Sequence, residues 1–126
     1  MQLCETKVGE KLCESFWNCI KGNITLGSGN YRVGVDLGTA NVVVAVVDDE
    51  DNPVAGKIER AEVVRDGIVV DFVRARNIVE RMVRELEQDL GTDLRYGACA
   101  VPPGTGEGDF RAVRYVVESA GLEVLD

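Results

Sequence analysis

The chain contains no histidine, and this absence removes several classes of active site at once. Neither a Ser/His nor a Cys/His nucleophilic pair can be assembled, and zinc sites built on imidazole are excluded as well. The 126 residues include 14 Lys or Arg against 22 Asp or Glu, so the net charge is −8. Nucleic-acid and anionic-membrane surfaces need clustered basic side chains, so we expect neither as a partner.

Long apolar runs are also missing. No stretch of 18 apolar residues occurs, which predicts no membrane-spanning helix. The first residues lack the charged-then-apolar pattern of a secretory signal, so we expect a cytoplasmic protein. Four cysteines are present, and their spacing does not fit a zinc ribbon: Cys4, Cys13, Cys19 and Cys99. We expect free thiols, with Cys99 buried in a strand; a metal or redox role for the first three is the alternative.

The length suits one ordinary domain preceded by a short arm. Residues 1–21 carry an apolar stripe at helical spacing, formed by Leu3, Val8, Leu12, Phe16 and Ile20. Gly22 should end this helix, and residues 27–30 are typical of a flexible linker. We therefore predict an N-terminal helical arm and linker over residues 1–30 and a globular part over residues 31–126. The apolar face of the arm either docks on that globular part or meets a partner.

Residues 32–47 predict two β-strands rich in β-branched residues, joined by a tight turn. The turn suits a magnesium-bound phosphate. Gly38 would let phosphate oxygens approach main-chain N–H groups, Thr39 could donate its hydroxyl, and Asp36 could hold the water shell of Mg²⁺. An ordinary hairpin, in which Asp36 and Gly38 serve only to form the turn, is the alternative interpretation.

The remaining elements alternate in type. The acidic residues 48–53 predict a solvated loop rather than a metal site, followed by a strand over 54–64 and a short extended piece over 68–70. A helix should begin after Asp71 and stop at Gly91, with an apolar face formed by Phe72, Ala75, Val79, Met82, Val83, Leu86 and Leu90. A fourth strand over 94–101 precedes a Pro-Gly loop over 102–106, at the sheet edge where ligands bind in open α/β folds.

A second helix is expected over 108–120, with Phe110, Val113, Val116, Val117 and Ala120 on one face, and a further strand begins at 122–125. The order β-β-β-α-β-α-β predicts an α/β fold, in which helices pack on a mixed sheet. This order is similar to the ribonuclease H-like arrangement of one lobe of an actin-like ATPase.

Three segments carry a more specific resemblance. Residues 35–41 (VDLGTAN) resemble the first phosphate motif of the superfamily of actin, MreB and heat-shock chaperone ATPases. Residues 63–72 are similar to the segment that leads into the long helix of that group. Residues 100–105, with 118–124 after them, resemble one branch of it, the EutJ family of ethanolamine-utilisation proteins. The resemblance covers residues 31–126.

The resemblance implies a two-lobed fold that holds ATP or ADP with Mg²⁺ in the cleft between the lobes. By position, Asp36 would organise Mg²⁺ through water, and the first phosphate loop would comprise Gly38, Thr39, Ala40 and Asn41. Asp109 falls where MreB-like relatives place the glutamate that positions the attacking water, and Glu107 is the neighbouring candidate. Asp109 and Glu107 are the catalytic candidates that the resemblance implies.

The chain departs from the superfamily in lacking the second glycine-rich phosphate loop and the adenosine motif, so residues 31–126 match a first lobe with the second lobe absent. Phosphoryl transfer needs charge stabilisation from several sides, so we expect weak nucleotide binding and little or no hydrolysis by this chain alone. An uncovered sheet edge or the N-terminal helix would then favour self-association.

The expected function is that of an ATP–Mg-binding lobe in a chaperone-like protein of bacterial ethanolamine utilisation, with a place in the cytoplasm or at the microcompartment. The resemblance suggests ethanolamine ammonia-lyase and microcompartment proteins as partners. Three alternatives use the same type of fold: a non-catalytic protein-interaction module, an assembly protein of the MreB/FtsA type, and a ribonuclease H-like nuclease. The nuclease would need further carboxylates near Asp36, and the strand ending at Val101 supplies none.

Overall fold

The computed structural model describes residues 30–66, 68–100 and 106–124. Residues 1–29 of the predicted N-terminal arm and linker, with Cys4, Cys13 and Cys19, lie outside these residues, as do residues 102–105 of the predicted loop over 102–106.

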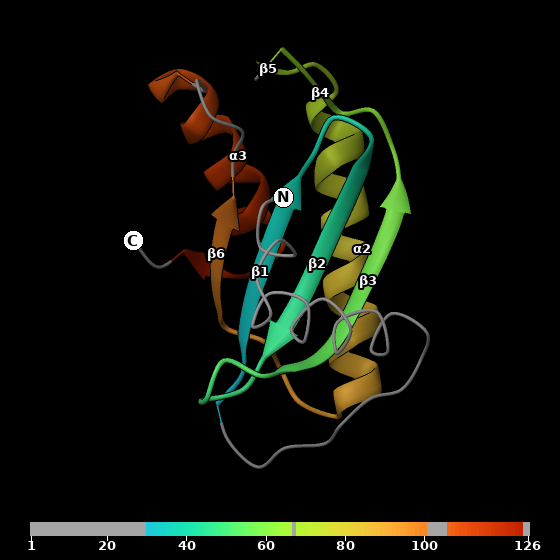
Figure 1. Cartoon of the computed structure of the whole chain (residues 1–126), viewed down its shortest axis with the longest axis vertical. Helices are drawn as coiled ribbons and strands as arrows, with labels where there is room; N and C mark the ends of the chain where they lie inside the picture. Colours follow the sequence, from blue (N-terminus) through green and yellow to red (C-terminus); the bar gives the residue numbers. More distant parts are fainter. Residues whose placement is uncertain (1–29, 67, 101–105, 125–126) are drawn as a thin grey trace, which may run out of the picture.

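Five strands form one mixed sheet in the order β3-β2-β1-β6-β7 (Figure 1). The strands β1 (Arg32–Leu37), β2 (Asn41–Val47) and β3 (Pro53–Arg60) form an antiparallel meander. The strand β6 (Tyr96–Ala100) runs parallel to β1, and β7 (Glu123–Val124) runs parallel to β6. A separate two-stranded ribbon, β4 (Val64–Arg65) and β5 (Ile68–Val69), leads toward the first described helix.

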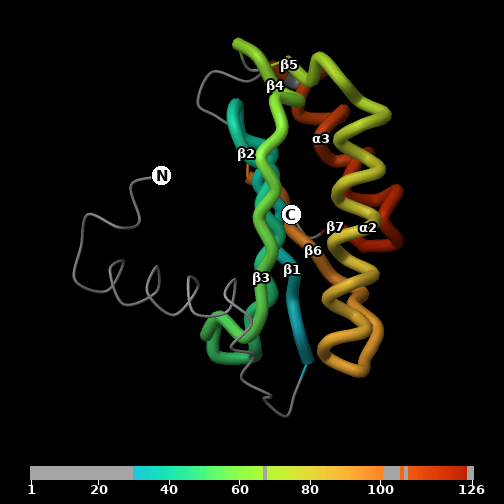
Figure 2. Tube along the Cα trace, turned by 90° about the vertical axis from the view of Figure 1, so that its right-hand side faces the viewer, coloured from blue at the N-terminus to red at the C-terminus, as the bar shows by residue number. Residues whose placement is uncertain are grey.

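Two helices, α2 (Phe72–Leu90) and α3 (Glu107–Ser119), lie side by side on the same face of the sheet (Figure 2). The carboxylate of Asp71 caps α2 by accepting a hydrogen bond from the N–H of Arg74 at 3.1 Å. Gly91 ends α2 in the left-handed conformation with φ 70°, which glycine adopts without steric strain. No helix among the described residues is long and apolar enough to cross a membrane.

The core lies between the sheet and the two helices. Alternate residues of β1 and β2 point into it, so that Val33, Val35, Leu37, Val42, Val44 and Val46 are buried. They meet the apolar face of α2, formed by Ala75, Ile78, Val79, Met82, Val83, Leu86 and Leu90. The sequence predicted this face except for Ile78, and it also included Phe72, which is only partly buried.

The observed element order and the α/β class confirm the predicted fold, with three local corrections. The predicted strand over 54–64 is two pieces, because the chain leaves the sheet after Arg60 and pairs again only at Val64 in the ribbon. Phe110 is 39% exposed rather than on a buried face, because the first turn of α3 extends past the ends of the strands (Figure 1). Cys99 lies in β6 but is half-buried.

Candidate functional site

Asp36 lies near the carboxyl end of β1, between Val43 of β2 and Ala100 of β6. Because successive side chains of a strand point to opposite faces, Asp36 points away from the core and from the helices. Its side chain is half-buried, and this burial raises the pKa of the carboxyl above its ordinary value of 3.8. No other described residue hydrogen bonds or pairs with this carboxylate. A partly desolvated carboxylate without a partner is stabilised by a nearby cation.

The turn that follows has two residues at its tip, Thr39 and Ala40. The N–H of Gly38 donates to the carbonyl oxygen of Asn41 at 2.9 Å and closes the turn. A Cβ atom at Gly38 would lie 3.0 Å from that same oxygen, so a larger residue would force the backbone apart. Within the described part of the chain, the N–H groups of Thr39 and Ala40 and the Thr39 hydroxyl make no hydrogen bonds. The donors open to a ligand are therefore those at the tip, while the Gly38 N–H is already used.

One contact that holds this turn in place was not apparent from the sequence. The N–H of Ala61 donates to the carbonyl oxygen of Ala40 at 2.9 Å and fixes the tip against the segment that follows β3. Both groups belong to the backbone, so the residue types at positions 40 and 61 do not indicate this hydrogen bond in the sequence. The turn is therefore held at its base by Gly38 and Asn41 and at its tip by Ala61.

The predicted catalytic candidates lie at the same end of the molecule as the turn. Glu107 is the first residue of α3, and Asp109 lies half-buried in its first turn. The start of α3 and the carboxyl ends of β1 and β6 meet at this end of the sheet (Figure 1). However, α3 packs on the face that carries the core, whereas Asp36 points to the other face. The structure thus brings Asp36 and Asp109 to one edge of the sheet without bringing them into contact.

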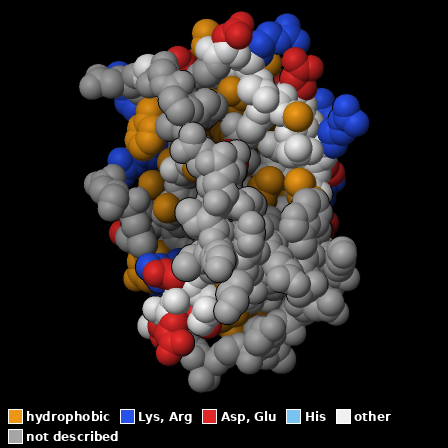
Figure 3. All heavy atoms as spheres, in the orientation of Figure 1, with side chains coloured by type: hydrophobic (Ala, Val, Ile, Leu, Met, Phe, Trp, Pro, Cys, Tyr) orange, Lys and Arg blue, Asp and Glu red, His pale blue; other side chains and the backbone are white. Residues whose placement is uncertain are grey.

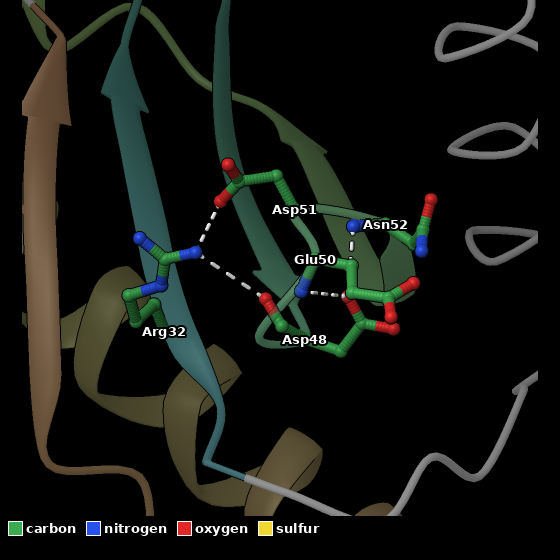
Figure 4. Close-up of polar contacts among 5 residues, drawn as sticks. All are labelled: Arg32, Asp48, Glu50, Asp51 and Asn52. Atoms are coloured by element: carbon green, nitrogen blue, oxygen red, sulfur yellow. Dashed lines mark hydrogen bonds and ion pairs between the residues drawn. The ribbon is translucent and has the colours of Figure 1, made fainter.

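The acidic loop between β2 and β3 lies at the opposite end of the sheet (Figure 4). The Asp48 carboxylate accepts hydrogen bonds from the N–H groups of Glu50 and Asn52, both at 2.9 Å. The bond from Asn52 contributes most to lowering the pKa of Asp48. Arg32 pairs with the Asp51 carboxylate and donates to the Asp48 carbonyl at 3.4 Å. These acidic residues stabilise the turn, and among the described residues no group of three or more Cys, Asp or Glu side chains is arranged to hold a metal ion.

A hollow of about 640 Å³ also lies at this opposite end, beside the start of β1 and β6. Tyr31, Arg32, Asp49, Arg95 and Tyr96 contribute to its lining. Because Asp36 and the glycine turn are at the other end of β1, this hollow is distinct from the phosphate site that the sequence predicts.

Comparison with known proteins identifies the relatives of this chain. The chain matches no protein-family model. It is 51% identical over 92 residues to the ethanolamine utilization protein EutJ of Escherichia coli, and this match covers 73% of the chain. The chain belongs to the EutJ family. It spans only about a third of the length of the E. coli protein, since the match covers 32% of it.

Solved structures agree with this assignment. A crystal structure of EutJ from Carboxydothermus hydrogenoformans superposes with a TM-score of 0.85 at 38% identity, covering 98% of this chain and 45% of that one. MreB5 of Spiroplasma citri bound to ADP superposes with a TM-score of 0.54 at 19% identity, covering 76% of this chain and 37% of MreB5. The likeness to MreB5 shows the fold alone. The described residues thus have the fold of an actin-like ATPase lobe, as the sequence predicted.

Proposed function

We propose that this chain is the nucleotide-binding first lobe of a chaperone-like EutJ protein that acts in the cytoplasm in bacterial ethanolamine utilisation. The observation that carries the proposal is the arrangement around the turn after β1. The half-buried carboxylate of Asp36 lies at the end of the strand that enters this turn, and the amides of Thr39 and Ala40 at its tip make no hydrogen bond to any described residue. A cation and the phosphate it accompanies would satisfy both kinds of group at once.

The residues of this turn fit a magnesium-bound phosphate from one side. Asp36 would hold a water ligand of Mg²⁺, and the amides of Thr39 and Ala40 with the Thr39 hydroxyl would donate to phosphate oxygens. Bound Mg²⁺ would neutralise charge on the phosphates. Asp109 would orient water at the same sheet edge, and Glu107 stays the alternative candidate for this role. The related MreB5 was crystallised with ADP and with AMPPNP, which supports a nucleotide as the ligand class.

A single lobe leaves the rest of the nucleotide open to water. Hydrolysis depends on charge stabilisation from several directions and on a positioned nucleophile, so one turn supplies only part of what is needed. We therefore expect binding without appreciable turnover by this chain. In a longer EutJ protein, ethanolamine ammonia-lyase and microcompartment proteins would be the candidate partners.

Thermal unfolding in the presence of nucleotide tests this proposal. ATP with Mg²⁺ at a hundred times its dissociation constant should add about 2.7 kcal/mol to the free energy of unfolding. For a domain of this size, that corresponds to a rise of about 10–14 °C in Tm. The variant Asp36→Asn should abolish the magnesium-dependent part of the shift, because the amide no longer holds the water shell of the cation. Asp93→Asn makes the same substitution at an exposed position in the loop before β6 and serves as the matched control.

The proposal fails if ATP–Mg²⁺ leaves the Tm of the chain unchanged up to millimolar nucleotide. It also fails if Asp36→Asn and Asp93→Asn respond alike. Omission of Mg²⁺ provides a further arm, since a shift of equal size with and without the cation would contradict the role given to Asp36.

One observation favours a second candidate, a non-catalytic protein-interaction module. Five large apolar side chains are exposed on β5, α2 and α3 and on the residue after β5, namely Ile68, Val70, Val73, Phe110 and Tyr115, and α3 contacts both β5 and α2. The ring of Tyr115 stacks against that of Phe72 with centroids 5.5 Å apart, which joins α3 to the start of α2. Exposed apolar side chains gathered in this way are typical of protein contacts. A chain that uses this surface alone would show no thermal shift with nucleotide.

A further inference from the structure

The sheet has a second face, and no helix or strand among the described residues covers it (Figure 2). The pairing register brings four small residues of neighbouring strands into one row across this face: Ala98, Gly34, Ala45 and Gly56. No side chain in this row is larger than a methyl group. A Cβ atom built on Gly34 would have no neighbour within 4 Å among the described residues.

Apolar side chains flank this row on both sides. Val43 and Ile58 are paired on the side toward the glycine turn, and Val47 lies on the other side. Figure 3 looks onto this face of the molecule. Along β2, three of the four residues that point to this face are apolar, namely Val43, Ala45 and Val47, whereas a strand face adapted to water would carry polar side chains at these positions.

The chain itself contains a segment suited to this surface. Residues 1–29 precede Asn30, and the chain enters β1 two residues later, at Arg32. This strand is the central strand of the sheet. The apolar stripe of residues 1–29, from Leu3 to Ile20, would extend over about 26 Å as a helix, close to the roughly 23 Å of a seven-residue strand such as β2. The nine residues 22–30 can span up to about 30 Å, so the stripe can reach the whole face.

Charge is compatible with this placement. Residues 1–29 contain three Lys and three Glu, so the net charge of −8 is carried by the rest of the chain. A neutral segment approaches an acidic domain without net repulsion. The short connection also gives the segment a high effective concentration at its own domain, which favours it over the same segment of a second copy.

We propose that residues 3–20 dock through their apolar stripe on the second face of the sheet of the same chain, over the row of Gly34, Ala45, Gly56 and Ala98. The removal of apolar surface from water on both sides provides the driving force. Asp36 points to this same face beside Val43, so the docked segment lies next to the proposed phosphate turn without contributing to it.

Trp17 is the single tryptophan of the chain and lies at the border of the stripe, so its fluorescence reports docking in the complete chain. We expect a blue-shifted emission and protection from acrylamide quenching in the wild-type protein. Ala45→Glu introduces a charge at the centre of the face, and it should shift the emission to the red and abolish the protection. Phe16→Glu, within the stripe, should have the same effect. Asn77→Glu places the same charge on the exposed side of α2 and should change nothing.

Far-UV circular dichroism establishes that each variant is folded. If Ala45→Glu does not fold, Ile58→Glu replaces it, because Ile58 lies on the edge strand β3 and is 38% exposed. The proposal is overturned if Trp17 of the wild-type chain is quenched as readily as free tryptophan, or if the charges on the sheet face leave its protection intact. Protection that disappears on dilution would overturn it too, because the occupant would then be the segment of a second copy.

Discussion

Leu86 and Val73 lie on the same helix and provide a test of how burial, rather than apolar character alone, stabilises this fold. Leu86 is 1% exposed in the core between α2 and the sheet, whereas Val73 is 56% exposed. Replacement by alanine removes carbon atoms from both residues. In Leu86→Ala these atoms leave a cavity in the core, but in Val73→Ala they were already in contact with water.

The expected loss for Leu86→Ala follows from its burial. About three buried carbon atoms are removed, and at about 0.8 kcal/mol for each the transfer contribution is roughly 2.4 kcal/mol. The cavity left behind raises the total to about 3–4 kcal/mol, within the range found for buried leucines. A domain of this size has a free energy of unfolding of about 5–15 kcal/mol, so this one substitution removes a large fraction of the stability. Val73→Ala should change it by less than about 0.5 kcal/mol.

Urea unfolding followed by far-UV circular dichroism measures both values. The slope of the free energy against urea should be the same for the two variants, so that the difference appears as a shift in the midpoint. Equal losses in the two variants would refute the reasoning, since they would mean that α2 does not present the Leu86 side to the core. A loss below about 1 kcal/mol for Leu86→Ala would refute it as well.

Two further predictions concern the cap of α2 and the carboxylate of the proposed site. Asp71→Ala removes the acceptor for the Arg74 N–H and should lower the free energy of unfolding by about 1 kcal/mol. Asp71→Asn can still cap the helix and should lower it much less. Thermal melts of the two variants measure the difference. Because burial raises the pKa of Asp36, the folded chain binds more protons than the unfolded chain between the ordinary value of 3.8 and the raised value. Its contribution to the free energy of unfolding therefore falls as pH rises through that window. Asp36→Asn removes this contribution, so in urea titrations at several pH values without nucleotide the variant should be more stable than the wild type at pH 7 and lose that advantage in acid. A variant less stable than the wild type at pH 7 would contradict the assignment.

Local chemistry made several elements predictable from the sequence. The bounds of α2 follow from Asp71 and Gly91, because a capping carboxylate and a left-handed glycine act through neighbouring residues of the chain. The alternation of β1 and β2 follows from the period of a strand. Residues 35–41 resembled the phosphate motif of the superfamily, and residues 100–105 with 118–124 indicated the EutJ family, which the 51% identity confirms.

The site was only partly predictable. Its residues could be named, but the sequence did not indicate that the Gly38 N–H is consumed within the turn or that Ala61 anchors the tip. Those bonds join backbone groups whose distance depends on how β2 and β3 pair. The roles of Asp36, Thr39 and Asp109 toward a nucleotide stay predictions, which the thermal measurements address.

By itself, the sequence determined the type, order and approximate limits of the elements and the family of the protein, because periodicity, caps and motifs are properties of neighbouring residues. Only the tertiary structure decided that Phe110 is exposed, that Asp36 points away from the helices, and that α3 starts at the same edge of the sheet. These features depend on strand register and on where each helix ends relative to the sheet. Both are set by contacts between residues far apart in the chain, which no local pattern encodes.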